Sequence, residues 1–550
     1  SAAGSGGMSR IFHDVIREHI LPPNWARAPP PPIMINSWEA QYFDVSHDSI
    51  VQMAVDAKRL GIEMVVLDDG WFGERHSDTT SLGDWTPNTT KFPLGIRGVA
   101  HELDSMGMKM GLWFEPEMVS AKSELYKKHP DWCLHVPGRA RQTGRNQLVL
   151  DMGRQDVCDY LYDAISNILS TAKISYVKWD MNRYLTEVFS ARVSSRDQGR
   201  VAHRFVTGTY SLLRRIFTES FPDVLLESCS GGGGRFDMGM LFFSPQVWTS
   251  DNTDARCRLK IQHGTSLAYP AQCMGSHYSV VPNHITMSMS RSRSRALVAM
   301  CGTFGYELDL GETFAGVQDD EEGGGVSASV GGVTRGGVLG GGGSSSGSSS
   351  SGSCGSHGGG GGGGSHVGSR ADSDRVKERQ KIRDHIRVFK EIQHIVREGD
   401  LYRIWSPFEN REGNAAEFSA CAWMYVLKDR SEAVVFVFNM GTPHWSTLMP
   451  RIRLRGLMEE AVYSVSEPLP NSLTRMQGNL KVIETEDPVF LLGAQVRKMS
   501  GGAMMHMGLP IKFFSEDDAI LFHVTTRNPI SSSLSKGSGL NLERHGGDSG

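Results

Sequence analysis

The stretch ISYVKWDMNR, residues 174–183, decides the fold. An apolar run from Ile174 to Val177 ends in a cluster that contains Lys178, Asp180 and Asn182. A buried run of this length that delivers polar side chains at its end is typical of a parallel strand whose C-terminal end forms one wall of a site. The stretch therefore predicts an α/β fold with a site at the carboxyl edge of its strands.

Apolar segments of strand length recur along the chain and alternate with amphipathic segments. The predicted strands are residues 33–37, 63–69, 109–115, 174–180, 223–229, 246–251, 272–278 and 302–308. Among the predicted helices are residues 49–60, 98–106, 156–170 and 203–220. Strands that alternate with helices in this way predict a (β/α)₈ TIM barrel over residues 31–399. The segment 272–278 is the weakest of these predictions, because its QCMG start has a poor strand propensity.

Glycine and serine dominate a segment inside the predicted barrel, at about residues 318–372. Such a composition cannot bury enough apolar surface to fold, so it predicts a disordered insertion. The insertion interrupts the last connection of the barrel, because residues 375–398 have the pattern of its eighth helix. An inert solvated loop is the favoured interpretation, ahead of a gating role at the barrel mouth.

The two ends of the chain differ from the barrel in their patterns. Residues 400–527 contain short β-branched and aromatic runs, such as 433–438, and predict an all-β C-terminal sandwich. Residues 528–550 are polar and predict a disordered tail. Residues 1–30 are expected to be an N-terminal remnant, with PPNWARAPPPP (22–32) as an extended linker.

Composition excludes several classes of protein. A net charge of −4 and a pI of about 6.6 provide no basic face, so nucleic acid partners are not expected. No window approaches 18 uninterrupted apolar residues, and the first residues lack the layout of a signal peptide, so no membrane association is expected and the location is cytoplasmic by default. The eight cysteines include no CxxC pair, which argues against a zinc ribbon or a disulfide framework.

Two carboxylates at strand ends suggest acid–base and nucleophilic chemistry of the kind that cleaves glycosides. Asp180 is expected to be the nucleophile, because Lys178 and Asn182 share its side of the strand and would keep it ionised. Asp251, at the end of the predicted strand 246–251, is expected to be the acid/base. Asp254 is its local rival, but a cap of the following helix is the more ordinary role for Asp254.

Further carboxylates end the second and third predicted strands. Asp68 and Asp69 are costly to bury unless they meet hydroxyls or cations, and a sugar supplies hydroxyls. Glu115 and Glu117 are also candidates for catalysis, but supports that form ion pairs or hydrogen bonds are the favoured interpretation. The glycine run 231–234 does not fit a dinucleotide loop, because Phe236 occupies the place of the third glycine. No metal site and no cofactor are expected.

Several motifs in a fixed order are specific enough to suggest a family. KWDMNR, ESCSGGGGRFD (227–237) and WTSDNTDA (248–255) resemble the microbial-type α-galactosidases of glycoside hydrolase family 36. NSWEAQYFD (36–44), LDDGWFG (67–73), GLWFEPEMVS (111–120), RNQLVLDMG (145–153) and GTFGYELDL (302–310) match in the same order. The resemblance covers residues 15–315 densely and 373–525 more loosely. It implies a retaining exo-acting enzyme for terminal α-galactosides of the melibiose and raffinose type.

The resemblance also assigns residues to the site. It gives the nucleophile and acid/base roles to the same two positions, Asp180 and Asp251. It implies that Asp68 and Asp69 bind the hydroxyls at the far edge of the galactose ring. The remaining pocket residues that it implies are Trp38, Trp113, Arg145, Lys178, Asn182, Cys229, Gly231 and Gly232.

One departure from the family concerns the front of the chain. Full-length members carry a large β-sandwich before the barrel, which helps to build a tetramer and the rim of the pocket, and most of that domain is expected to be missing from this sequence. Two other functions therefore stay open. One is galactosyl transfer of the raffinose-synthase type, and the other is a non-catalytic sugar-binding role.

Overall fold

The computed structural model describes residues 4–26, 28–314, 367–408, 419–441, 450–469, 497–511, 513 and 517–526. The chain divides into two compact units, Gly311–Gln380 and the remainder. The smaller unit contains α12 (Gly311–Phe314) and the first part of α13 (Val367–Glu398). The expected insertion, at about residues 318–372, lies outside the described residues as far as residue 366, and α13 begins at Val367. The predicted tail 528–550 lies wholly outside the described residues.

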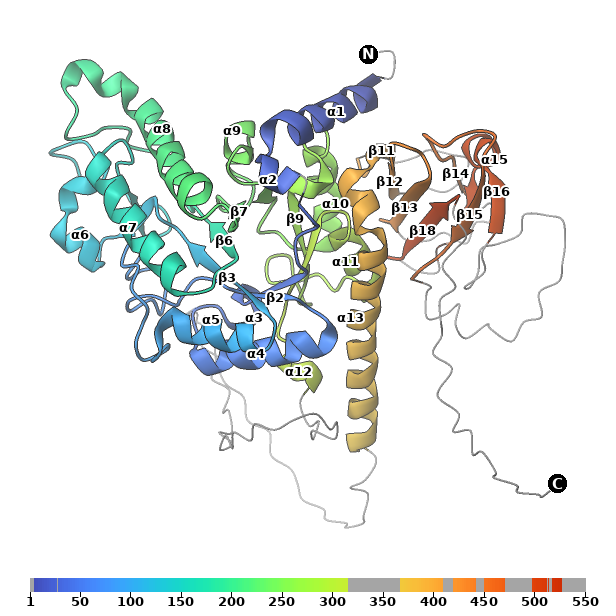
Figure 1. The fold of residues 1–550 in the computed structure, drawn as a ribbon, viewed down its shortest axis with the longest axis horizontal. Helices are drawn as coiled ribbons and strands as arrows, with labels where there is room; N and C mark the ends of the chain where they lie inside the picture. Colours follow the sequence, from blue (N-terminus) through green and yellow to red (C-terminus); the bar gives the residue numbers. More distant parts are fainter. Residues whose placement is uncertain are drawn as a thin grey trace, which may run out of the picture. The chain divides into compact units, whose positions relative to one another are not determined.

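Eight parallel strands close into a barrel, which confirms the predicted fold class (Figure 1). Around the barrel the strands follow the order β1-β10-β9-β8-β7-β6-β3-β2. Their bounds are β1 Met34–Asn36, β2 Met64–Leu67, β3 Lys109–Phe114, β6 Tyr176–Trp179, β7 Leu225–Ser228, β8 Gln246–Trp248, β9 Met274–Ser279 and β10 Thr303–Glu307. The pairs of β1 with β2 and with β10 close the ring. Even the segment with poor propensity forms a strand, β9, because its neighbours supply the pairing on both sides.

Apolar side chains fill the barrel interior near the start of the strands. Met34, Met64, Val66, Tyr176 and Leu225 form one buried cluster there. The cluster leaves no room for a side chain on β3, where a Cβ on residue 111 would lie 2.8 Å from the Tyr176 ring, so this position requires glycine. The polar residues that follow the strands therefore lie at the opposite, carboxyl end of the barrel, where active sites of this fold are found.

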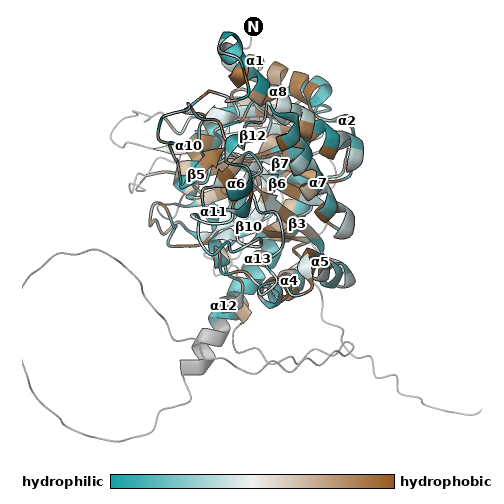
Figure 2. Ribbon diagram, turned by 90° about the vertical axis from the view of Figure 1, so that its left-hand side faces the viewer, coloured by the Kyte–Doolittle hydropathy of each residue, from teal (hydrophilic) through white to brown (hydrophobic). Residues whose placement is uncertain are grey.

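Helices follow most of the strands. The bounds of the longer ones are α4 His47–Leu60, α5 Gly95–Ser105, α7 Gln155–Thr171, α8 Val201–Leu213, α10 Ala255–Thr265 and α11 Ser292–Ala299. Sequence sets the ends of α4, because Ser46 and Ser49 form a capping box and Gly61 ends the helix at a φ of 91°. Apolar and polar residues alternate along α7 and α8, as expected for helices with one buried face (Figure 2). Among the described helices, none combines the length and apolarity that a membrane crossing requires.

An antiparallel β domain follows the barrel, as the sequence predicts. Its six-stranded sheet has the order β11-β12-β13-β18-β15-β16, and β14 pairs with β17 separately. The bounds are β11 Asp400–Trp405, β12 Ala420–Val426, β13 Glu432–Asn439, β14 Arg451–Ile452, β15 Val462–Ser466, β16 Arg497–Ser500, β17 Leu509–Pro510 and β18 Ala519–Thr525. Residues from both sheets, such as Val435 and Ile452, share one buried apolar core.

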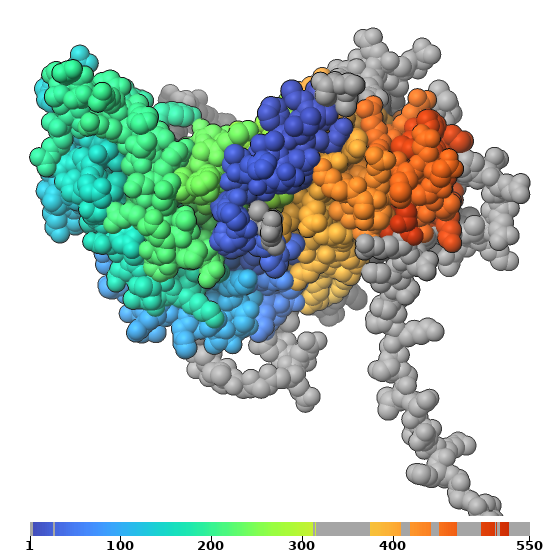
Figure 3. Space-filling view, turned by 45° about the horizontal axis from the view of Figure 1, so that its top comes forward, coloured from blue at the N-terminus to red at the C-terminus, as the bar shows by residue number. Residues whose placement is uncertain are grey.

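The N-terminal segment is largely helical. Residues Gly4–Val15 form α1, and Ile16–Ile20 continue it as the π-helical turn η1. Ile16 is fully buried against Leu241 and Val247 of the barrel region. Figure 3 shows this segment in dark blue, lying along the surface of the protein. Within the segment 22–32, which was expected to be extended, Pro23–Ala26 form the short helix α2.

Candidate active site

Asp180 directly follows β6 and accepts hydrogen bonds from four donors. The backbone N–H groups of Met181 and Gly231 donate to Oδ1, at 2.8 and 3.3 Å. The Asn182 amide and the Trp113 indole donate to Oδ2, at 2.7 and 3.4 Å. Asp180 itself is only 6% exposed. Donors that converge on a carboxylate from several sides stabilise its negative charge and fix the direction of its oxygens.

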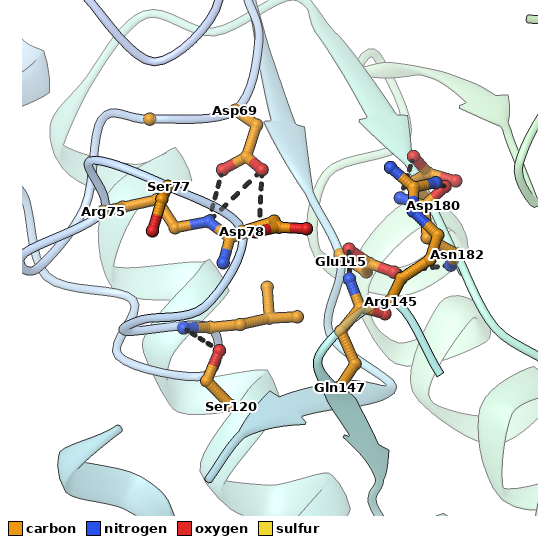
Figure 4. Close-up of polar contacts among 12 residues, drawn as sticks. Asp69, Arg75, Ser77, Asp78, Glu115, Ser120, Arg145, Gln147, Asp180 and Asn182 are labelled. Carbon is orange, nitrogen blue, oxygen red and sulfur yellow. Dashed lines mark hydrogen bonds and ion pairs between the residues drawn. The ribbon is translucent and has the colours of Figure 1, made fainter. Parts of the chain in front are cut away.

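Asn182 connects Asp180 to two other parts of the barrel rim (Figure 4). Its backbone N–H donates to Glu115 Oε1 at 2.5 Å, and its side-chain oxygen accepts from Arg145 Nη1 at 2.5 Å. Arg145 comes from the connection before β5 (Gln147–Val149), has a φ of 49° and is exposed. Its guanidinium therefore lies at the open side of the site, while Glu115 lies beneath it.

Lys178 pairs with Asp68 and makes no direct contact with Asp180. Its Nζ lies 2.8 Å from Asp68 Oδ2, and the Asn36 amide donates to the same oxygen at 2.7 Å. Burial disfavours the Lys178 charge, but the carboxylate of Asp68 raises the pKa of Lys178 well above its ordinary value. The Lys178 side chain reaches past β3 to the residue that follows β2, and its charge also interacts with that of Asp180.

Asp69 forms a buried bidentate ion pair with Arg75, as Figure 4 shows. Arg75 Nε and Nη2 lie 2.9 and 2.8 Å from its two oxygens, and Arg75 is 1% exposed. Burial raises the pKa of Asp69, and Arg75 opposes that rise. Sequence reasoning missed Arg75, since it lies in an irregular loop where no pattern indicates which way an arginine points.

Asp251 lies in the loop after β8 and is exposed at the mouth of the barrel. The Trp248 indole donates to its Oδ1 at 3.0 Å. The Trp248 ring also packs against two other side chains. The Arg258 guanidinium lies 4.5 Å from the ring centroid, and the centroid of the His277 ring lies 4.4 Å from it. The surrounding pocket walls raise the pKa of Asp251 by desolvation, and the negative charge of Asp180 raises it further. A carboxyl with a raised pKa can carry the proton that a general acid delivers.

Asp254 has the cap role that made it the weaker candidate for acid catalysis. Its side chain accepts the backbone N–H groups of Arg256 and Cys257 and so caps α10. The Thr286 hydroxyl also donates to it. Burial favours its neutral form, but these hydrogen bonds outweigh burial and lower the pKa of Asp254. Asp254 therefore lacks the raised pKa that Asp251 has.

The loop after β7 brings backbone close to both carboxyl groups. Cys229 is 1% exposed, and its sulfur accepts the Gly232 N–H at 3.3 Å. Gly232 has a φ of 86°, and a Cβ there would lie 2.7 Å from the Cα of Ser250. Gly231 has a φ of 52° and donates its N–H to Asp180. The two glycines thus hold the β7 and β8 loops together, a close approach that a side chain would prevent.

The two tryptophans expected in the pocket have different surroundings. Trp38 is half-buried and packs edge-on against Tyr42 and Phe43 at 5.2 Å. Trp113 is 2% exposed and parallel to Phe72, with its N–H on Asp180. Trp113 thus orients Asp180, a role that sequence reasoning did not give it.

The structure brings most of the predicted residues to one end of the barrel, each from the carboxyl end of a strand or the loop after it. Among the residues that the structure describes, no group of three or more His, Cys, Asp or Glu is arranged to hold a metal ion. The absence of a metal or cofactor stays a prediction.

Comparison with protein families gives two matches. A family described as Melibiase matches residues 1–322, and the glycosyl hydrolase family 36 C-terminal domain matches residues 420–524. The two matches together cover the barrel strands and most strands of the β domain.

Curated relatives and solved structures agree with these matches. Alpha-galactosidase AgaA of Geobacillus stearothermophilus is 43% identical over 84% of this chain and 54% of the relative. Alpha-galactosidase Mel36A of Lactobacillus acidophilus is 39% identical over 84% of this chain and 53% of the relative. A variant of AgaA in complex with raffinose has a TM-score of 0.74 at 38% identity, and covers 95% of this chain and 59% of that one. The chain spans about half the length of the curated relatives it matches.

Proposed function

The chain belongs to the melibiase family, and from this premise we propose that it is a retaining exo-α-galactosidase. The observation that carries the proposal is the pair Asp180 and Asp251, which have opposed environments. Four donors converge on Asp180, whereas desolvation and the Asp180 charge raise the pKa of Asp251. Of two carboxyl groups in such different environments, one can act as the nucleophile and the other as the acid.

The reaction proceeds in two displacements. Asp180 Oδ attacks the anomeric carbon while Asp251 protonates the leaving oxygen, which forms a galactosyl ester on Asp180 and releases the aglycone. Asp251, now ionised, takes a proton from water, and that water displaces Asp180 from the anomeric carbon. Retention requires a carboxyl separation of about 5–5.5 Å. Trp248 orients Asp251 during both steps, since its N–H stays on Oδ1.

Substrate recognition rests on Asp68 and Asp69. Both are buried, and each already has a cation on one side, Lys178 on Asp68 and Arg75 on Asp69. A carboxylate accepts at about four positions, so each retains capacity for a sugar hydroxyl. The raffinose complex of the AgaA variant supports raffinose-type oligosaccharides and melibiose as the substrates.

The test is release of nitrophenol from a nitrophenyl α-galactoside by this chain. We expect hydrolysis in water, with loss of turnover in Asp180→Asn, because an amide cannot form the ester. An added sugar acceptor that captured most of the galactose would indicate a galactosyltransferase. Binding of galactose without any nitrophenol release would indicate a non-catalytic sugar-binding protein.

A further inference from the structure

Two buried glutamates follow β3, and their partners differ. Glu115 and Glu117 are both 0% exposed. Glu117 pairs with Arg235 at 2.6 Å and accepts the Trp179 indole N–H at 3.0 Å. Glu115 accepts only N–H groups, from the Asn182 backbone at 2.5 Å and the Gln147 amide at 3.0 Å. Within the described part of the chain, no cationic side chain forms an ion pair with Glu115.

A buried carboxylate without a cation is costly, and the usual outcome is that it keeps its proton. Two neighbouring carboxyl groups add to that cost. Asp180 from the β6 loop and Asp69 from the β2 loop place negative charge near Glu115, although the hydrogen bonds from Asn182 act in the opposite sense. Burial first, and Asp180 second, raise the pKa of Glu115 to about 8. The Arg75 guanidinium, which forms its ion pair with Asp69, also interacts with the Glu115 charge, but it does not reverse this rise.

We propose that Glu115 is a positioning residue that acts as a neutral carboxylic acid, holding Asn182 in place and leaving the negative charge of the pair on Asp180. The inference rests on the proposed function, because it assigns Asp180 the ionised role. Glu115 and Asp180 both accept hydrogen bonds from Asn182, and the charge of Asp180 disfavours a charge on Glu115, so ionisation of both groups would be costly. Asp180, with four donors, is the better stabilised of the two.

Asn182 transmits the effect of Glu115 to Asp180. Its backbone N–H is fixed by Glu115, its side-chain oxygen by Arg145, and its amide N–H groups are thereby directed to Asp180 Oδ2. Gln147 completes the arrangement. Its Oε1 is buried and has no donor, and the two ends of an amide are alike in shape, so turning the amide offers an acceptor to the Glu115 proton.

The first experiment measures the thermal midpoint from pH 5 to pH 9 for the wild type and Glu115→Gln, without substrate. A carboxyl whose pKa is higher in the folded than in the unfolded chain binds more protons in the folded state, so stability falls as pH rises between the two pKa values. We expect this fall to be smaller in Glu115→Gln, which cannot ionise. An equal fall in both proteins would overturn the proposal.

Glu117→Gln is the matched control, since it makes the same change of a carboxyl to an amide two residues away. It breaks the ion pair with Arg235, so we expect a lower midpoint at every pH with the wild-type dependence on pH retained. If Glu117→Gln, rather than Glu115→Gln, reduced the pH dependence, the neutral carboxyl would be Glu117 and the proposal would be wrong.

The second experiment measures kcat and KM on the nitrophenyl galactoside near pH 6. We expect Glu115→Ala to lower kcat by about 10²-fold, and Glu115→Gln to recover at least about tenfold of that loss, because misplacement of the reacting group affects mainly the chemical step. A loss in Glu115→Gln as large as in Asp180→Asn would show that an ionised Glu115 is required, against the proposal. If the wild type hydrolysed no galactoside, the proposed function would fail, and the pH dependence of the midpoint would still decide whether Glu115 is neutral.

Discussion

At the scale of single residues, Asp251 has the property that distinguishes it from its neighbour Asp254. The pKa of Asp251 is raised and that of Asp254 is lowered, although only two residues separate them. The cause is local, since Asp254 caps α10 with backbone hydrogen bonds whereas Asp251 faces the desolvated site near Asp180. The proposed acid role therefore fits Asp251 better than Asp254.

Asp251→Ala should lose general-acid help of about 10²–10⁴ in rate. The loss should be smaller for a nitrophenyl galactoside than for melibiose, because a good leaving group needs little protonation. Rates on the two substrates, measured for the variant and the wild type, check this expectation. A loss of equal size on both substrates would argue against an acid role.

Asp254→Ala is the control for that measurement. Removal of the cap should cost about 0.5–2 kcal/mol of stability. It should not make the rate depend more strongly on the leaving group.

Asp69→Ala should weaken the binding of galactose and reduce the preference for α-galactosides over α-glucosides. A site built to bond a hydroxyl rejects an analogue that lacks it in that place by up to about 10⁴-fold. The comparison of kcat/KM for the two nitrophenyl glycosides in the wild type and the variant measures this preference. Comparable hydrolysis of both glycosides by the wild type would contradict the role of Asp68 and Asp69.

The sequence allowed the strand-end residues of the site to be predicted, but not all of their partners. Asp180 and Asp68 end apolar runs, so their position at the barrel mouth follows from periodicity. The pairing of Lys178 with Asp68 joins residues 110 positions apart, and no local pattern contains that information. Arg75 on Asp69 was missed because a loop has no periodicity from which a direction could be inferred.

At the scale of elements, the β7 and β8 loops depend on Gly232. A Cβ at this position would lie 2.7 Å from Ser250 Cα and 2.8 Å from Asp251 N, so the loop that carries Asp251 would have to move. The sequence shows the glycine run 231–234, but it does not show why position 232 requires glycine. The resemblance implied only that Gly231 and Gly232 line the galactose pocket, and the structure adds a close approach of Gly232 to a neighbouring loop.

Gly232→Ala should destabilise the protein by about 1–3 kcal/mol through overpacking and should also lower kcat by displacing Asp251. Gly231→Ala is the matched variant, since its Cβ would meet only Asn182 Oδ1, at 3.7 Å. The loss of stability in Gly231→Ala should reflect the positive φ of this residue alone and amount to about 1–2 kcal/mol. Denaturant unfolding of both variants gives the comparison, and a larger loss for Gly231→Ala would contradict the argument.

At the scale of the whole molecule, barrel and β domain both follow from the alternation of apolar segments, whereas the N-terminal helix does not. Eight buried runs with helices between them permit few other folds. The role of α1 and η1 depends on which surface they meet, and a short amphipathic segment does not identify that surface. Arg17 shows the difficulty, since it donates hydrogen bonds to Gln272, Arg397 and Gly399, which lie more than 250 positions away.

Ile16→Ala should lower the free energy of unfolding by about 2–5 kcal/mol, because Ile16 is fully buried against the barrel region. Ile11→Ala on the same helical segment is the control, since Ile11 is 59% exposed and its change should stay within about 0.5 kcal/mol. Equal losses, or none for Ile16→Ala, would contradict the packing of η1 against the barrel region.

The central claim is that Asp180 forms a covalent bond to galactose. It is tested most directly by incubating the protein with an activated fluorinated galactoside that slows release of the glycosyl-enzyme, followed by digestion and mass spectrometry. We expect the peptide containing Asp180 to gain the mass of one fluorogalactosyl group, and the same peptide of Asp180→Asn to gain none. A modified peptide containing Asp251 or Glu115 instead, or steady hydrolysis of galactosides without any labelled peptide, would contradict this claim.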